Sequence, residues 1–160
     1  MKFIIEQVAL CPTNPAAAIE LLTAMGLGEW ARDHVVADGV VFNELGRNEA
    51  DLAFNYQATS AKPLELEVLH YTSGNNWMRH PYRVNSVSHL GMHVTAEELA
   101  AWQEFFTARG IGCAQSVDTY SHTNPVISGQ RWYRYVIFDT KHILGVDVKF
   151  IVRKSSPDQK

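Results

Sequence analysis

The chain has 160 residues, of which 46% are hydrophobic and 19% are charged, and its net charge is −3 at pH 7. These values are typical of one globular domain, and the lack of a long basic run argues against nucleic acid as a partner. No apolar run approaches the length of a membrane span, and Glu6 interrupts the apolar start too early for a signal peptide. Cys11 and Cys113 lack metal-ligand spacing, so we expect two buried free thiols in a reducing cytoplasm.

The chain opens with a predicted strand that turns directly into a helix. Residues from Gln7 to Cys11 alternate in hydrophobicity, which is typical of a half-buried strand. Asn14 is a suitable helix N-cap, and Pro15 suits the first helical position because its fixed φ is already helical. We expect this helix to end before Gly28.

The rest of the first half predicts strands. The clearest runs from residue 64 to residue 71, and its alternation places Glu65 and Glu67 on the same face. Two carboxylates on one strand face are ordinary on a solvated sheet, but beside a buried cavity they would be metal ligands or bases. Before it we expect a strand over 29–36 that stops at Asp38-Gly39, and a hairpin of 40–45 with 51–57 across 46–48, which adds an extra strand to this half.

After a long connection, residues 88–94 repeat the opening pattern and carry two histidines on one face. His89, Gly91 and His93 alternate there with apolar side chains. Thr95 followed by Glu98 forms a capping box, which predicts a helix over 96–109. The pattern then predicts strands over 113–120, 131–138 and 144–152, with a loop over 121–125.

The two strand-and-helix units share one spacing. Gln7 and His89, Thr13 and Thr95, and Gly28 and Gly110 are each separated by 82 residues, as the numbering shows. Three coincident offsets predict an internal duplication, with each half built as a strand, a helix and three strands.

Four strand positions stand out under this duplication. Gln7 matches His89, and one of Glu65 and Glu67 matches Asp147. Two curved half-sheets related by a pseudo-two-fold axis would bring these side chains to a common cavity. One imidazole nitrogen and three oxygens suit a divalent ion such as Ni, Zn, Mn, Co, Fe or Mg, with open positions for a substrate that has neighbouring oxygens.

At these residues the chain resembles the vicinal oxygen chelate superfamily over residues 4–152. The run from Ser88 to Val94 is similar to the family's fifth strand, whose leading histidine binds metal, and Leu66–His70 resembles the fourth strand of glyoxalase I. The resemblance implies an α+β fold in which two βαβββ modules form a curved, barrel-like mixed sheet with helices packed outside. It implies a single domain over 1–152, with modules at 1–72 and 87–152, a crossover at 73–86, and a polar tail at 153–160.

Carried over residue by residue, the resemblance implies Gln7, Glu67, His89 and Asp147 as metal ligands, with Glu67 or Asp147 moving the proton. Glu65 is the competitor of Glu67. The chain departs from the family before its last strand, where Asp139 is followed by an insertion up to Gly145.

The resemblance leaves three hypotheses. The first is a metal-dependent enzyme of the glyoxalase I type, a lyase or isomerase acting on a small substrate with neighbouring oxygens. The second is a metal-free binding protein of the bleomycin-resistance type, with aromatic walls from residues such as Trp77, Tyr120, His122, Tyr133 and Tyr135. The third is an extradiol-type dioxygenase that uses His89, His93 and a carboxylate. The sequence allows either a closed monomer or a homodimer that exchanges halves.

Overall fold

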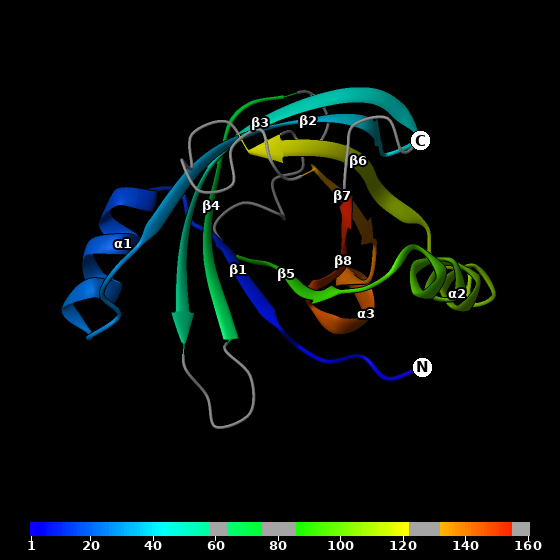
Figure 1. Cartoon of the computed structure of the whole chain (residues 1–160), viewed down its shortest axis with the longest axis horizontal. Coiled ribbons are helices and arrows are strands. Elements are labelled where there is room, and N and C mark those ends of the chain that lie inside the picture. Colours follow the sequence, from blue (N-terminus) through cyan, green and yellow to red (C-terminus); the bar gives the residue numbers. More distant parts are fainter. Residues whose placement is uncertain (58–63, 75–85, 122–131, 155–160) are drawn as a thin grey trace.

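The computed structural model describes residues 1–57, 64–74, 86–121 and 132–154. The strands of these residues close into a barrel in the order β1-β4-β3-β2-β6-β7-β8-β5, with the longer helices outside it (Figure 1). The elements in chain order are β1 (Gln7–Cys11), α1 (Pro15–Ala24), β2 (Ala31–Val41), β3 (Glu44–Gln57), β4 (Leu64–Gly74), β5 (Ser86–His93), α2 (Ala96–Thr107), β6 (Cys113–Ser121), β7 (Trp132–Phe138), α3 (Lys141–Leu144) and β8 (Asp147–Lys154). None of the helices in these ranges is long and apolar enough to cross a membrane.

The two halves have the predicted βαβββ order and matching strand pairings. β1 runs parallel to β4 with Gln7 beside Glu65, and β5 runs parallel to β8 with His89 beside Asp147. The predicted fold class is therefore confirmed, and the two halves repeat the same order of elements. The halves join within one chain, because β1 pairs antiparallel with β5 and β2 pairs antiparallel with β6.

The two longer helices begin where the sequence predicts. The Asn14 side chain accepts a hydrogen bond from the Ala17 amide, and both hydrogen bonds of the Thr95–Glu98 capping box are present. α1 packs Ile19 against β3 and β4, while α2 packs the aromatic rings of its buried stripe against β7 and β8. The outer faces of these strands are thus covered, and the inner faces are left to form a cavity.

The predicted position of the hairpin turn in the first half is wrong. β2 continues through Asp38 and Gly39, and the turn falls at Phe42 and Asn43, whose φ values are 49° and 65°. Gly39 permits this because a Cβ there would lie 2.8 Å from the Val117 Cα on β6, so only glycine lets the two strands pair so closely. The expected extra strand is absent, since residues 44–57 form the single strand β3.

The second half differs from the prediction at its end. Residues 141–144 form the short helix α3, and β8 begins at Asp147 rather than at residue 144. Both cysteines are free as predicted, and Cys11 is buried, but Cys113 is exposed, so that part of the prediction is wrong. The predicted crossover residues 75–85, the loop residues 122–125 and the tail residues 155–160 lie outside the described residues.

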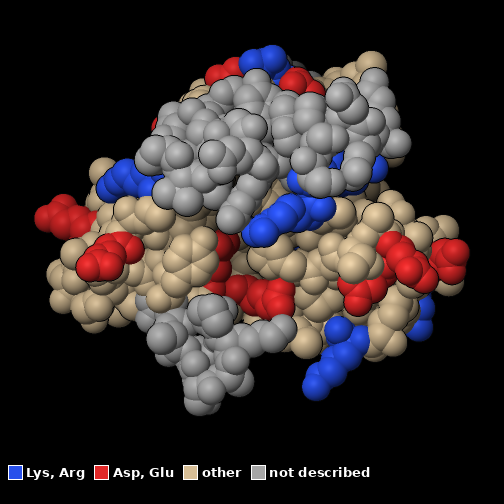
Figure 2. All heavy atoms as spheres, viewed as in Figure 1, with Lys and Arg blue, Asp and Glu red and all other residues tan. Residues whose placement is uncertain are grey.

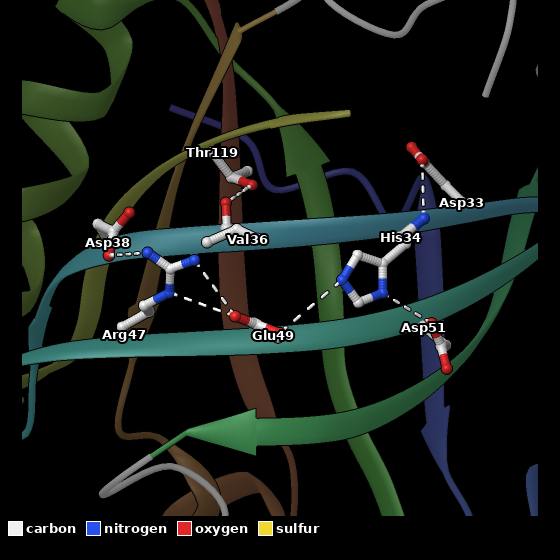
Figure 3. Close-up of polar contacts among 8 residues, drawn as sticks. All are labelled: Asp33, His34, Val36, Asp38, Arg47, Glu49, Asp51 and Thr119. Carbon is white, nitrogen blue, oxygen red and sulfur yellow. Dashed lines mark hydrogen bonds and ion pairs between the residues drawn. The ribbon is translucent and has the colours of Figure 1, made fainter. Parts of the chain in front are cut away.

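The outer face of β2 and β3 carries a chain of charged side chains in the part of the barrel shown in Figure 3. Arg47 lies 3.2 Å from Glu49 and 4.0 Å from Asp38, and the His34 Nδ1 lies 2.8 Å from Asp51. These side chains alternate with inward-facing residues of the same strands. The network is a solvated surface, and its Glu49 is a carboxylate that lies outside the cavity.

Candidate active site

The barrel encloses an open cavity of about 490 Å³ between its strands. Such a volume falls in the range of sites for small molecules. One part of the wall is apolar and aromatic, and Tyr133 and Tyr135 line it as the sequence predicts. The main polar part is formed by side chains of β1, β4, β5 and β8, and β2, β3 and β6 add Asp33, Asn48 and Gln115. Figure 2 shows acidic and basic side chains next to each other near the centre of one face of the molecule.

The polar wall is built from two neighbouring rows of inward-facing residues. The first row holds Glu65, Gln7, Gly91 and Lys149, which are paired in register across the four strands. The second row holds Glu67, Ala9, His89 and Asp147 in the same strand order. Because strand side chains alternate, residues two apart face the same side, and both rows point into the barrel.

Four side chains of these rows meet in one buried cluster. The Lys149 Nζ lies 3.2 Å from the Gln7 Oε1, 3.2 Å from the His89 Nε2 and 3.6 Å from the Glu67 Oε2. The His89 Nε2 also lies 2.9 Å from the Gln7 Oε1 and 3.6 Å from the Glu67 Oε2. Gly91 permits this meeting, since it lies between Gln7 and Lys149 in the sheet and has no side chain.

The cluster is oriented by polar neighbours. The Gln7 Nε2 donates a hydrogen bond to the Glu65 carboxylate, which turns the Gln7 Oε1 towards Lys149 and His89. The Ser88 Oγ lies 3.2 Å from the His89 Nδ1 and holds the ring from its other side. The Glu67 Oε2 is buried and makes no hydrogen bond within the part of the chain that the structure describes. The same oxygen lies 3.6 Å from both the Lys149 Nζ and the His89 Nε2, so its contacts in the cluster are ion-pair contacts.

Together, burial and the neighbouring charges lower the pKa of Glu67 and of His89, and they raise the pKa of Glu65. Burial raises the pKa of Glu67, but the charge of Lys149 and the contact with His89 outweigh it and lower the pKa to about 2. Burial and the charge of Lys149 lower the pKa of His89 to about 4, so this histidine is neutral at pH 7. Burial and the charge of Glu67 raise the pKa of Glu65. One carboxylate is thus held ionised while its neighbour is pushed towards the protonated form.

The structure brings together three of the four residues predicted as metal ligands, namely Gln7, Glu67 and His89. Asp147 is fully buried beside His89 in the register, and its Oδ1 accepts a hydrogen bond from the Lys141 backbone at 3.2 Å. The side chain of β8 that contacts the other three is Lys149, which the sequence reasoning missed. The offset of 82 residues was a usable signal, because it relates Glu67 to Lys149 and Glu65 to Asp147.

The structure does not bring together the residues of the dioxygenase hypothesis. His93 lines the cavity on the same face as His89, but its Nδ1 lies 3.1 Å from the Glu6 carboxylate, outside the cluster. Of the other aromatic residues expected in the pocket, Trp77 and His122 lie outside the described residues, as does the Tyr120 side chain.

The donor atoms of the cluster have the right chemistry for a divalent ion, but their arrangement does not fit one. An ion bound to the Gln7 oxygen, the His89 nitrogen and the Glu67 oxygen would lie about 2.0–2.3 Å from each of them. The Lys149 ammonium already lies close to these same three atoms. The ion and the ammonium would compete for one position, and both are cations.

Replacing Gly91 by alanine is expected to destabilise the protein by about 1–3 kcal/mol through crowding of the cluster. A Cβ at this position would lie 2.9 Å from the Gln7 Oε1 and 3.0 Å from the Gln7 Cβ. Urea unfolding measures the loss. Gly112→Ala is the matched control, because a Cβ there meets nothing within 4 Å. Equal stability of the two variants would contradict the crowding of Gln7.

His89 is expected to make the protein less stable as the pH falls from 6.5 to about 4. In this range the unfolded chain protonates His89 at its ordinary pKa of 6.5, whereas the folded protein keeps it neutral down to about 4. The loss amounts to about 3 kcal/mol. Urea unfolding at pH 7 and pH 4.5 measures most of it. The raised pKa of Glu65 acts with the opposite sign, so the informative quantity is the difference between variants.

His89→Gln is expected to flatten this pH dependence, and the matched control His93→Gln is expected to keep it, because His93 is exposed. If His89→Gln and the native protein lost the same stability between pH 7 and pH 4.5, the burial of a neutral His89 would be excluded as the cause.

No family model matches this sequence, and no curated protein matches it significantly. Solved structures do match over nearly the whole chain. A variant of methylmalonyl-CoA epimerase from Streptomyces coelicolor, in complex with 2-nitronate-propionyl-CoA, has a TM-score of 0.55 at 12% identity and 95% coverage of both chains. Methylmalonyl-CoA epimerase from Mycobacterium tuberculosis has a TM-score of 0.50 at 13% identity, with coverage of 95% of this chain and 91% of that one.

A hypothetical protein from Bacillus halodurans C-125 also matches, with a TM-score of 0.53 at 10% identity and 97% coverage of both chains. Identities this low show the fold and no more. The chain has the vicinal oxygen chelate fold, a closed barrel-like sheet with helices outside it. The resemblance to that superfamily is supported by the fold alone.

Proposed function

We propose that this chain is an isomerase or epimerase that moves a proton at a carbon next to a carbonyl group in a small substrate. The observation that carries the proposal is the buried pair of Glu67 and Lys149 on the cavity wall, with 3.6 Å between carboxylate and ammonium. A base and a positive charge side by side are the two groups that such a proton transfer needs.

In the proposed reaction, the substrate carbonyl oxygen approaches the Lys149 ammonium and the adjacent carbon faces Glu67. The Glu67 carboxylate takes the proton from this carbon, and the electron pair of the broken C–H bond moves onto the carbonyl oxygen as an enolate. The ammonium stabilises the negative charge that develops there. Return of the proton to a carbon restores the carbonyl and leaves Glu67 ionised, so no other reactant is consumed.

Glu65 is the proposed acid partner of Glu67. It lies on the same face of β4, two residues away, and its raised pKa favours the protonated form that donates. Proton removal by Glu67 and delivery by Glu65 to the other side of the same carbon would invert that centre. This route leaves Glu67 protonated and Glu65 ionised, and proton exchange with water resets both before the next turnover. Removal by Glu67 and return to the neighbouring carbon of a hydroxy-carbonyl substrate would instead isomerise it. Asp147 stays a predicted catalytic residue, held at the N-terminal end of α3 by its bond to the Lys141 amide.

The proposal is tested by hydrogen exchange in D2O. Methylmalonyl-CoA and the hemithioacetal of methylglyoxal with glutathione are suitable probes, because each carries a C–H bond next to a carbonyl group. The loss of that C–H signal in proton NMR is expected to be faster with the native protein than with the heat-denatured protein. Exchange at the buffer rate for carbonyl probes that bind in the cavity would reject the proposal.

A second candidate is a metal-free binding protein of the bleomycin-resistance type. It is favoured by the aromatic and apolar share of the cavity wall, which includes Leu52, Phe54, Leu69, Tyr133 and Tyr135. Binding of a ligand that quenches tryptophan or tyrosine fluorescence, without exchange or turnover, would favour this function over the enzyme. A homodimer and a cytoplasmic location stay predictions, which light scattering and cell fractionation would test.

A further inference from the structure

At one pair of matching positions in the site, the two halves of the barrel carry side chains of opposite charge. The offset of 82 residues that relates Gln7 to His89 also relates Glu67 to Lys149. The strand pairings follow the same relation, since Glu67 pairs with Ala9 on β1 and Lys149 pairs with Gly91 on β5. The pseudo-two-fold axis therefore relates Lys149 in the second half of the barrel to the Glu67 carboxylate in the first half.

The Lys149 ammonium occupies the centre of the polar cluster rather than its edge. Its Nζ lies within 3.2–3.6 Å of an atom from each of Gln7, His89 and Glu67, and 4.3 Å from the centre of the Tyr135 ring. The side chain is 7% exposed, so water does not replace these contacts. A buried ammonium is stable only when it is paired in this way.

Lys149 already supplies a positive charge at the centre of the cluster, where its Nζ lies 3.6 Å from the Glu67 carboxylate. Two further acidic side chains lie next to the cluster, because Glu65 accepts a hydrogen bond from Gln7 and the buried Asp147 lies beside His89 in the register. A divalent ion in the same place would add two positive charges next to the ammonium. At separations of a few Å in a buried site, that repulsion opposes binding of the ion as long as the ammonium holds this position.

We infer that the Lys149 ammonium is the resident cation of this site, in place of a divalent metal ion. The inference rests on the site of the proposed function and deepens it, because it names the group that receives the substrate oxygen. It also names the ligand class, which is a molecule with a carbonyl or carboxylate oxygen for the ammonium and an apolar body for the aromatic wall. Chelators of divalent ions are expected to leave the activity unchanged.

Titration calorimetry with NiCl2, ZnCl2 and MnCl2 tests the inference without reference to activity. The native protein is expected to bind none of these ions in the cavity at micromolar concentrations. Lys149→Glu gives each half of the site one carboxylate, at positions 67 and 149, and we expect this variant to bind one ion per chain at least about 100-fold more tightly than the native protein. The double variant Lys149→Glu with His89→Ala is expected to lose this gain.

Two further variants are measured beside Lys149→Glu. If Lys149→Glu fails to fold, Lys149→Met replaces it, and a gain in metal affinity is expected again because the competing cation is gone. Lys154→Met is the matched control, since Lys154 pairs with Asp118 away from the cluster and its loss should change no metal affinity.

One stoichiometric ion in the native protein that is lost in His89→Ala would overturn the inference, whatever the activity. Metal affinities that are equal in the native protein and in both folded Lys149 variants would overturn it as well. A native protein that binds no ion and exchanges no substrate proton would instead uphold Lys149 as the cation and reject the proposed function.

Discussion

Replacing Glu67 by glutamine is expected to lower the rate of substrate proton exchange by about 10²- to 10⁴-fold, the usual contribution of a general base. Glutamine keeps the shape of the side chain but cannot take a proton. The carboxylate it replaces is ionised at neutral pH, and its buried Oε2 accepts no hydrogen bond within the described part of the chain. The measurement is the exchange of the probe C–H bond in D2O, followed by NMR.

The matched control is Glu49→Gln, the same substitution on the outer face of β3. Glu49 pairs with Arg47 in the surface network, outside the cavity, and the exchange rate of this variant should equal that of the native protein (Figure 3). An exchange rate that stays unchanged in Glu67→Gln but falls in Glu65→Gln would assign the base to Glu65 instead.

Replacing Lys149 by methionine is expected to destabilise the protein by about 3–5 kcal/mol at pH 7. Methionine fills a similar volume, but it leaves the Glu67 carboxylate buried without its positive partner. The Glu67 side chain is 2% exposed, so water cannot take over the role of the ammonium. Urea unfolding of the native protein and the variant at pH 7 measures the loss.

The double variant Glu67→Gln with Lys149→Met is expected to recover much of this loss, because it removes both charges together. Its destabilisation should be smaller than the sum of the two single effects, which a double-mutant cycle measures as a coupling energy. Lys154→Met is the control for loss of a lysine on the same strand. Its partner Asp118 is 44% exposed, and its cost should be about 1 kcal/mol or less. Additive single effects in the cycle would refute the Glu67–Lys149 pairing.

Local patterns in the sequence were sufficient for most of the fold. The alternation of residues 7–11 and 88–94 predicted the strands β1 and β5, and the residues at Asn14 and Thr95 predicted where both helices begin. These signals depend on side chains a few residues apart, which interact in the same way in any surroundings. The duplication, read from a single repeated offset, then predicted the paired modules.

The turn between β2 and β3 could not be read in the same way. Gly46 and Asn48 are residue types common in turns, yet they lie within β3. The whole length of β2 pairs with β3, and Gly46 and Asn48 take part in this pairing. Phe42 and Asn43 form the turn instead, although phenylalanine is uncommon at positive φ. Many strand pairs on both sides stabilise this register, and together they outweigh the local preference of the turn residues.

By itself the sequence predicted the fold class, and strand alternation with the repeated offset brought Gln7, His89 and one of Glu65 and Glu67 into one predicted site. The choice of Glu67 came from the resemblance to the vicinal oxygen chelate superfamily. Only the tertiary structure showed that Lys149, rather than Asp147, is the side chain of β8 that contacts Gln7, His89 and Glu67. The two residues are two positions apart on the same face of β8, so alternation cannot tell them apart. The choice depends on the register between β8 and β5, which long-range strand pairing sets, and on Gly91, which leaves room for Lys149 to reach Gln7.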